Sequence, residues 1–422
     1  MRIRFQKQKR EQGGVLMVTF FIACFIGIAL CSSLLLVSSQ NTLVVRSQAW
    51  NAALAMAEAG AEEALAQLNP GATAETITVD RTANGWGASS GGFYGPITGR
   101  LTNSSYTVVF TDATFPIIYS TGYVTVPSIS ATLTRVVRVA TTNVPLFNVS
   151  MAALTNVTDT GNGLATDSFD SANTNLSTNG SYDPAKTSTN GNVASLYGTV
   201  NLGGHTINGS VFLGPTANLA GGTVTGSVHN DLNIDFPQVV MPSGAGSWTT
   251  LALATPGIVG GVLYNNVFLT SGDYIIPSLS GTIYVAPSAK VRLKVLSGGT
   301  GAIKIAGTGA TAGNLTIYMA APSFSIVGNA SVDSGNAANL TYYGLPSNTS
   351  ITFSGSATFT GTIYAPSADM TMNGGGGSSY NFVGSSITRS VTIHGNFMFH
   401  WDQNLLNASP SRGYLAVSWR EI

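Results

Sequence analysis

Four aspartates lie among Asn and Ser residues in the middle of the chain, and their carboxylates could supply oxygen ligands to calcium: Asp159, Asp167, Asp170 and Asp183. Calcium takes roughly six to eight oxygen ligands, and the spacing here matches neither an EF-hand loop nor a nonapeptide calcium repeat. Aspartates in such surroundings also accept hydrogen bonds from turn backbones. We therefore predict that they cap turns, with a calcium site between Asp159 and Asp183 as the alternative.

Two histidines and a carboxylate near the C-terminal end could serve acid–base catalysis or metal binding: His394, His400 and Asp402. Aromatic residues surround them in the sequence, and no third catalytic partner is evident. The other two histidines, His205 and His229, lie far away in the chain. The pattern predicts a structural closing cap, with no catalytic residue, no metal and no cofactor.

Enzymes that cleave polysaccharides need clustered carboxylates, or a basic residue beside metal-binding acids. Residues 236–332 contain one acid, Asp273. Lys290, Arg292 and Lys294 alternate with apolar residues and have no acid close by in the sequence, which favours a solvated strand face. We therefore predict that the protein is not an enzyme. An anchored carbohydrate-binding or carbohydrate-active protein is the alternative.

The composition narrows the function further. Only 9% of the 422 residues are charged, whereas about 25% is usual for a soluble domain. The formal net charge is zero, which argues against a nucleic-acid partner, since binding to nucleic acid needs a basic surface. Two cysteines, Cys24 and Cys31, provide neither a disulfide framework nor a cysteine-based zinc site.

One segment is apolar and long enough to cross a membrane. No charged residue occurs from Gln12 to Val45, and Val15–Val37 suffices to span a bilayer as a helix. Five basic residues precede it within 1–14, so the N-terminus is expected in the cytoplasm. The uncharged stretch 236–272 is broken by Pro and Gly residues and is not a second span. We predict a single-pass protein of the bacterial cytoplasmic membrane with a periplasmic or surface-exposed bulk.

The apolar segment continues into an amphipathic helix that ends at Asn69-Pro70-Gly71. Its apolar residues recur at spacings of three and four and form one stripe: Trp50, Ala53, Leu54, Ala57, Ala61, Ala64, Leu65 and Leu68. If the helix is continuous over 15–70, it is on the order of 80 Å long. The pattern predicts a narrow seam of small residues above the membrane.

These first residues resemble the PilX-like minor pilins of type IV pilus and type II secretion-like systems. The resemblance rests on the basic leader that ends in Gly13-Gly14-Val15 and on the Ala-Glu-Ala-Gly stretch at 57–60. It implies cleavage by a prepilin peptidase after Gly13 or Gly14, and packing of the mature helix with other pilin-like helices. The glutamate of major pilins at the fifth mature position is absent, because Thr19 or Val18 stands there. An ordinary signal-anchor helix is the alternative.

The remainder of the chain is rich in strands. β-Branched and aromatic runs bounded by turn residues predict a small pilin-type β-sheet over 71–145. Beyond it, four segments share an apolar strand, a tyrosine and a Pro-Ser step, with the tyrosines at Tyr284, Tyr318, Tyr343 and Tyr364. Internal repetition of this kind is typical of a solenoid. We predict a parallel, right-handed β-solenoid over 146–408 and keep an antiparallel sandwich or jelly roll as the alternative.

The second half also resembles β-helical domains that follow PilX-like N-termini in some bacteria. The matching elements include Gly361-Thr-Ile-Tyr-Ala-Pro366, His400-Trp401-Asp402 and a C-terminal strand within 409–422. The chain is thus predicted to be mainly β, with a long N-terminal transmembrane helix. The function implied is that of a membrane-anchored minor pilin whose solenoid acts as a rigid spacer or as an adhesive module for a polysaccharide or other surface ligand.

Overall fold

The computed structural model describes residues 12–69, 84–87, 90–126, 131–161, 163–242, 244–251, 255–299, 301–327, 329–354, 358–374, 380–408 and 411–422. The chain divides into two compact units. One comprises 1–66, 85–141 and 416–422, and the other comprises 67–84 and 142–415. Most of the predicted basic leader lies outside the described residues.

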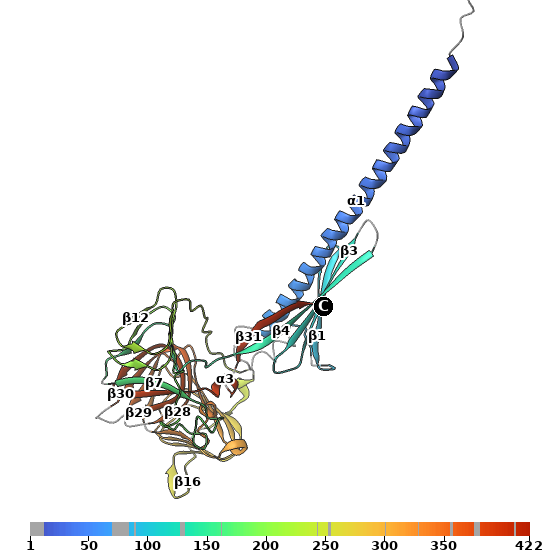
Figure 1. Ribbon diagram of the computed structural model, residues 1–422. Coiled ribbons are helices and arrows are strands. Elements are labelled where there is room, and N and C mark those ends of the chain that lie inside the picture. The colour runs from blue at the N-terminus through green and yellow to red at the C-terminus, as the bar shows by residue number, and fades with distance from the viewer. Residues whose placement is uncertain are drawn as a thin grey trace, which may run out of the picture. The chain divides into compact units, whose positions relative to one another are not determined.

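The first unit contains one long helix, α1, which runs from Gln12 to Leu68 (Figure 1). Its 57 residues make a rod on the order of 85 Å long. Neither Pro nor a β-branched cluster interrupts the apolar run, and Asn69 follows its end. The prediction of one continuous N-terminal helix is confirmed.

A five-stranded sheet belongs to the same unit and has the order β1-β2-β3-β4-β31. The first four strands form an antiparallel meander. The strands are β1 (Phe93–Leu101), β2 (Ser104–Thr111), β3 (Ile117–Val126), β4 (Ala131–Pro145) and β31 (Ser411–Glu421). The C-terminal strand thus joins the small sheet, although the family resemblance places it with the solenoid half.

The C-terminal half of α1 lies against this sheet through small side chains. Ala53, Ala57, Ala61 and Ala64 are fully buried. Gly60 is buried as well, and a side chain there would overlap Ser120 Oγ. The observed stripe differs from the predicted one at Trp50, which is 47% exposed, because the helix presents its narrowest residues to the sheet and leaves its largest ring outside.

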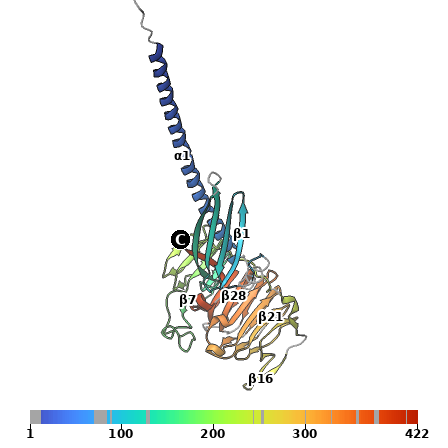
Figure 2. The ribbon, with the colours of Figure 1, turned by 90° about the vertical axis from the view of Figure 1, so that its right-hand side faces the viewer.

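The second unit is built on a 24-stranded sheet, called the coiled sheet below, in which the chain winds through successive coils (Figure 2). Its strands pair in parallel with those of the next coil, so that they stack in three ladders. The strands are short because each coil turns after a few residues. Mainly β structure with a parallel sheet of many strands is confirmed, and the antiparallel alternative is wrong.

The first ladder stacks, in spatial order, β13 (Thr223–Val224), β10 (Thr206–Ile207), β7 (Gly163–Phe169), β30 (Asn396–Asp402), the start of β29 (Tyr380–His394), the start of β28 (Phe359–Asn373), β25 (Ala330–Val332), β22 (Ile303–Ile305), β20 (Ile283–Val285) and β18 (Asn266–Phe268).

The second ladder stacks β14 (Val228–His229), β11 (Val211–Leu213), β8 (Val193–Ser195), β5 (Met151–Ala153), the middles of β29 and β28, β26 (Leu340–Gly344), β23 (Asn314–Met319), β21 (Lys290–Val295), β19 (Gly272–Ile276) and β15 (Thr249–Thr250). The third stacks β12 (Asn218–Ala220), β9 (Thr199–Asn201), β6 (Val157–Asp159), the ends of β29 and β28, β27 (Ser350–Ser354) and β24 (Ser323–Val327).

Short elements complete the unit. They are the antiparallel hairpin β16 (Gly257–Val259) and β17 (Val262–Tyr264), the short helix α3 (Leu405–Ala408), and three 3₁₀ turns, η1 (Ala245–Ser247), η2 (Gly309–Thr311) and η3 (Ala337–Asn339).

The coils do not follow the chain from one end to the other. Residues 151–229 wind away from β29, whereas 249–402 wind toward it from the opposite end, so β5 pairs with β29 and β7 with β30. Residues 230–242, called the strap, start the return from β14 to β15. Ten strand spacings separate these two strands, about 48 Å, which takes up most of the roughly 66–72 Å that a fully extended chain could span between His229 and Thr249.

Two hydrophobic clusters hold the coiled sheet together. The inner cluster fills the coils with Val, Ile, Leu and Phe side chains, such as Val291, Leu293 and Val295 on β21. The outer cluster lies on the other side of the second ladder and contains Tyr318, Tyr343 and Tyr364 with strap residues. Because successive strand residues point to opposite faces, a single strand contributes to both clusters.

Candidate functional site

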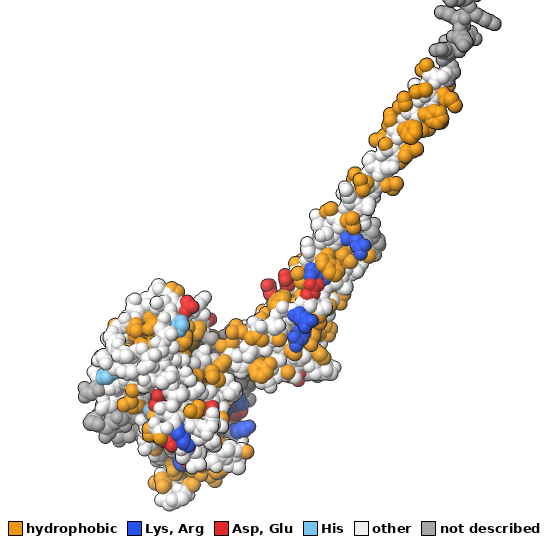
Figure 3. Space-filling view, viewed as in Figure 1, with side chains coloured by type: hydrophobic (Ala, Val, Ile, Leu, Met, Phe, Trp, Pro, Cys, Tyr) orange, Lys and Arg blue, Asp and Glu red, His pale blue; other side chains and the backbone are white. Residues whose placement is uncertain are grey.

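The first candidate is the apolar part of α1. Large apolar side chains from Val15 to Val37 are 51–77% exposed in the isolated chain, for example Leu16 at 77%. Figure 3 shows this segment covered by hydrophobic side chains on the visible face. By length and composition the helix could cross a membrane. Gly13, Gly14 and Val15 lie in its first turns, and cleavage beside them stays a prediction.

His400 belongs to a buried polar cluster in the coiled sheet. Its Nδ1 lies 2.6 Å from Asp167 Oδ1, and its Nε2 lies 3.1 Å from Asn381 Oδ1. The Tyr182 ring stacks on the imidazole with centroids 3.6 Å apart, and its hydroxyl donates to Asp167 Oδ2 at 2.9 Å. Burial and the neighbouring carboxylate raise the pKa of Tyr182.

This cluster ties the segment 170–192 to β30 and β7. His400 is 4% exposed, and both of its ring nitrogens are engaged, so neither is available to a substrate. The histidine therefore orders the loop around Tyr182. The sequence pointed to His400 but did not connect it with Asn381 and Tyr182, because no spacing rule links these residues.

Asp402 is fully buried and holds three backbone segments together. Its carboxylate accepts hydrogen bonds from the backbone amides of Ser171 at 3.0 Å, Asn404 at 3.1 Å and Ala337 at 3.4 Å. Burial raises the pKa of Asp402, and these amides oppose the rise. His394 instead lies 2.6 Å from Thr160 Oγ1. His394, His400 and Asp402 thus make separate contacts, and the closing cap stays a prediction.

The aspartates considered for calcium also have separate partners. Asp159 pairs with His205 at 2.5 Å and accepts from the Gly161 amide at 2.8 Å. Asp170 accepts from the Ala172 amide at 2.9 Å, and Asp183 from the Ala185 amide at 2.9 Å. Among the described residues, no group of three or more His, Cys, Asp or Glu side chains could hold a metal ion.

The basic strand β21 differs from its prediction in one respect. Arg292 does have an acidic companion, because its Nε and Nη2 donate to Asp273 at 2.7 and 2.6 Å. This bidentate contact lowers the pKa of Asp273. The two residues are 19 positions apart in the chain and meet only because β19 and β21 are register neighbours.

A column of aromatic side chains runs along the outer side of the second ladder. Tyr318, Tyr343 and Tyr364 occupy equivalent positions on successive strands. The first two rings stack with centroids 5.3 Å apart, and the last two meet edge to face at 6.4 Å. Tyr284 is not in this column, because it lies on the first ladder. The four tyrosine segments are therefore not equivalent repeats.

The strap covers this column. Its residues alternate, with Leu232, Ile234 and Phe236 turned toward the coiled sheet and Asp231, Asn233 and Asp235 exposed. The Tyr364 hydroxyl donates to the Pro237 carbonyl at 2.7 Å, and Ser367 Oγ lies 2.6 Å from Gln238 Oε1. The alternation is visible in the sequence as a strand-like pattern, but nothing in it shows that the segment lies across other strands.

These features define a class of protein: one exposed apolar helix, continued by a small antiparallel sheet and joined to a parallel coiled sheet. A family model described as a domain of unknown function (DUF7305) matches residues 281–408. No curated protein matches the chain. Among solved structures, the competence-associated pilin ComZ from Thermus thermophilus aligns with 89% of this chain and 98% of that chain at 11% identity and a TM-score of 0.26, a value too low to establish a common fold.

Proposed function

We propose that this chain is a membrane-anchored structural protein similar to PilX-like minor pilins, with its N-terminus in the bacterial cytoplasm and the coiled sheet outside the membrane. The observation that carries the proposal is α1. The helix is apolar and exposed over Val15–Val37, and its C-terminal half then buries a seam of small residues under its own sheet. A helix of a soluble domain would bury its largest side chains instead.

The exposed apolar surface of α1 continues beyond the segment expected in lipid. Leu43 and Val44 are 63% and 54% exposed. Other pilin-like helices are the partners that this surface would suit, because apolar helices released from a membrane must bury their side chains elsewhere. The coiled sheet then serves as a spacer or as an adhesive module for a polysaccharide or other surface ligand.

Cleavage by a prepilin peptidase after Gly13 or Gly14 is part of this proposal. The protein is produced in bacteria with and without an active prepilin peptidase, the membranes are isolated, and the N-terminus is sequenced. We expect membrane-bound protein that begins at Gly14 or Val15 only when the peptidase is active. The double variant Gly13→Val, Gly14→Val is the control, and it should keep Met1 and remain in the membrane.

The two parts of the proposal fail separately. An intact Met1 in cells with active peptidase would remove the pilin-like processing and leave an ordinary anchor. Recovery of the full chain in the soluble fraction would remove the anchor itself. Protease added to spheroplasts tests the orientation, because only an outward coiled sheet would be digested from outside.

A further inference from the structure

The aromatic column of the second ladder contains a gap. In register after Tyr364 follow Ile387, Ala152, Ala194 and Phe212 on successive strands. Adjacent strands are about 4.8 Å apart, and side chains in parallel register lie directly above one another. Two alanines therefore leave a space of two strand widths between the Ile387 and Phe212 side chains.

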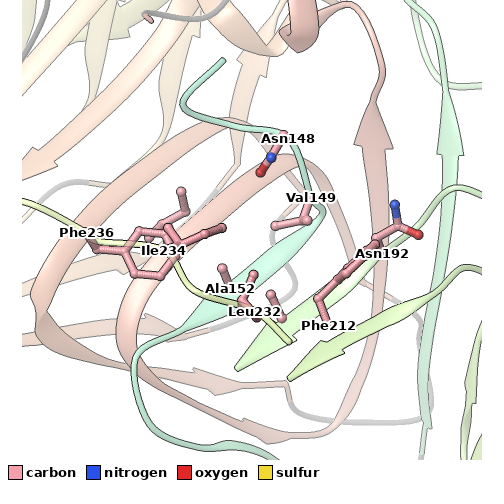
Figure 4. A pocket seen from close by; sticks show the side chains of 10 residues that line it. Asn148, Val149, Ala152, Asn192, Phe212, Leu232, Ile234 and Phe236 are labelled. Carbon is pink, nitrogen blue, oxygen red and sulfur yellow. The ribbon is translucent and has the colours of Figure 1, made fainter. Parts of the chain in front are cut away.

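The strap closes this space into a pocket of about 250 Å³. By the strand register, Ala152 and Ala194 form its floor, and Ile387 and Phe212 form its two ends. Leu232 and Ile234 line it from the strap (Figure 4). One face of the Phe212 ring stacks on His229, with centroids 5.0 Å apart and planes inclined by 9°. Its other face is turned toward the gap, where a second ring would extend the column.

The polar groups at the pocket are two asparagines. Asn192 uses its Oδ1 to accept a hydrogen bond from the Ser210 amide at 2.8 Å. Within the described residues, the Asn148 side chain makes no hydrogen bond, and it lies at the rim in Figure 4. None of the described residues that line the pocket is charged. The lining therefore suits a neutral molecule with one hydrogen-bonding group.

We propose that this pocket binds a small neutral aromatic molecule of the phenol or indole class. An apolar cavity of roughly 150 Å³ is sufficient for benzene, so 250 Å³ leaves space for a substituted ring. The ring lies between Phe212 and Ile387 and continues the column of Tyr318, Tyr343 and Tyr364. Its hydroxyl or N–H group reaches the Asn148 amide.

The test uses the full chain in lipid nanodiscs with p-cresol as the probe, measured by ligand-observed NMR with empty discs subtracted. We expect saturable binding that Ala194→Phe abolishes, because the new ring fills the gap. Ala194→Val, which adds only two methyl groups, should weaken binding. It keeps the test valid if the larger Ala194→Phe variant does not fold. Ala185→Phe, at an exposed position outside the pocket, is the matched control and should bind as the parent does.

The polar contact is tested separately with Asn148→Leu. Loss of one hydrogen bond should weaken p-cresol binding roughly three- to tenfold and leave toluene binding unchanged. N-acetyltyrosinamide distinguishes a free phenol from a tyrosine side chain of a polypeptide. If the natural ligand is a tyrosine side chain, N-acetyltyrosinamide must bind to the pocket; if it is a free molecule, it need not. No saturable binding of p-cresol to the parent, or equal binding to folded Ala194→Phe, would overturn the proposal.

Discussion

At the scale of single residues, two glycines set the distance between α1 and its sheet. A Cβ at Gly60 would overlap Ser120 Oγ and lie 2.7 Å from Tyr106 Cδ2. A Cβ at Gly122 would overlap the Ala53 carbonyl oxygen and lie 2.6 Å from the Ala57 amide nitrogen. The close approach lets the Tyr106 hydroxyl donate to Glu63, and burial together with this carboxylate raises the pKa of Tyr106 to about 12.

We expect Gly60→Ala to destabilise the first unit by about 1–3 kcal/mol, as overpacking of a tight contact does. The measurement is urea denaturation of the detergent-solubilised chain, followed by hydrogen exchange in β2 and β3. Gly27→Ala is the matched helix control, because a Cβ at Gly27 meets nothing within 4 Å. Equal stability of the Gly60 and Gly27 variants would show that the helix does not lie this close to the sheet.

Buried polar residues of the coiled sheet form hydrogen bonds between segments that are distant in the chain. Asp402 binds backbone amides from 171, 337 and 404, and His400 joins β30 to Asp167 on β7. Because their hydrogen-bonding groups are satisfied within the protein, such groups stabilise one arrangement of the coils and offer little to a substrate.

At the scale of elements, the strap and the tyrosine column depend on each other. Phe236 and Val239 are buried against Tyr318, Tyr343 and Tyr364 in the outer cluster. Unlike a strand, the strap lacks a ladder of backbone hydrogen bonds between Asn233 and Met241. Its attachment in this part therefore rests on side-chain burial and on the bonds made by Tyr364 and Ser367.

We expect Tyr364→Phe to lower the stability of the strap by about 1 kcal/mol, the net contribution of one hydrogen bond. The ring keeps its place in the column, so only the bond to the Pro237 carbonyl is lost. Limited proteolysis within 230–242 measures the change, and cleavage should become several-fold faster. Tyr197→Phe is the control because Tyr197 is 64% exposed. Unchanged cleavage in the Tyr364 variant would contradict this attachment.

At the scale of the whole molecule, both units are built from segments far apart in the chain. Residues 416–422 belong with 1–66 and 85–141 in the first unit. There the Ile422 amide donates to the Val136 carbonyl at 3.0 Å, and Glu421 pairs with Arg135. Arg135 in turn lies over the Trp50 ring at 4.9 Å. The C-terminus thus completes a sheet that begins more than 300 residues earlier.

Removal of 416–422 should destabilise the first unit and leave the second unchanged. The truncation exposes the edge of β4, so hydrogen exchange at 131–141 should become at least tenfold faster, while β28 and β29 keep their protection. Glu421→Gln is the milder control, since an ion pair with one partner 41% exposed contributes little, about 0–1 kcal/mol. Faster exchange in β28 and β29 as well would show that the two units do not unfold separately.

Local patterns predicted the elements whose structure is determined by neighbours in the sequence. The uncharged run after Gln12 predicts the helix. In a membrane-spanning helix, every backbone hydrogen bond is made within the segment itself. The alternation on β21, with Val291, Leu293 and Val295 inward, predicts a strand with one buried face. Turn residues and the repeated Thr-Ile-Tyr segments indicated parallel coils.

Which of these elements lie together follows from contacts between distant parts of the chain. Three features join residues that are distant in the chain. The coils wind from both ends toward β29 and β30, β31 belongs to the small sheet, and the strap crosses the second ladder. The choice of partner strand leaves no local sequence signal, because each strand bonds to the next coil and any similar strand would satisfy the same backbone groups. The pocket at Ala152 and Ala194 is an example. The strand register places these two alanines between Ile387 and Phe212, and nothing in the sequence around either alanine indicates a pocket.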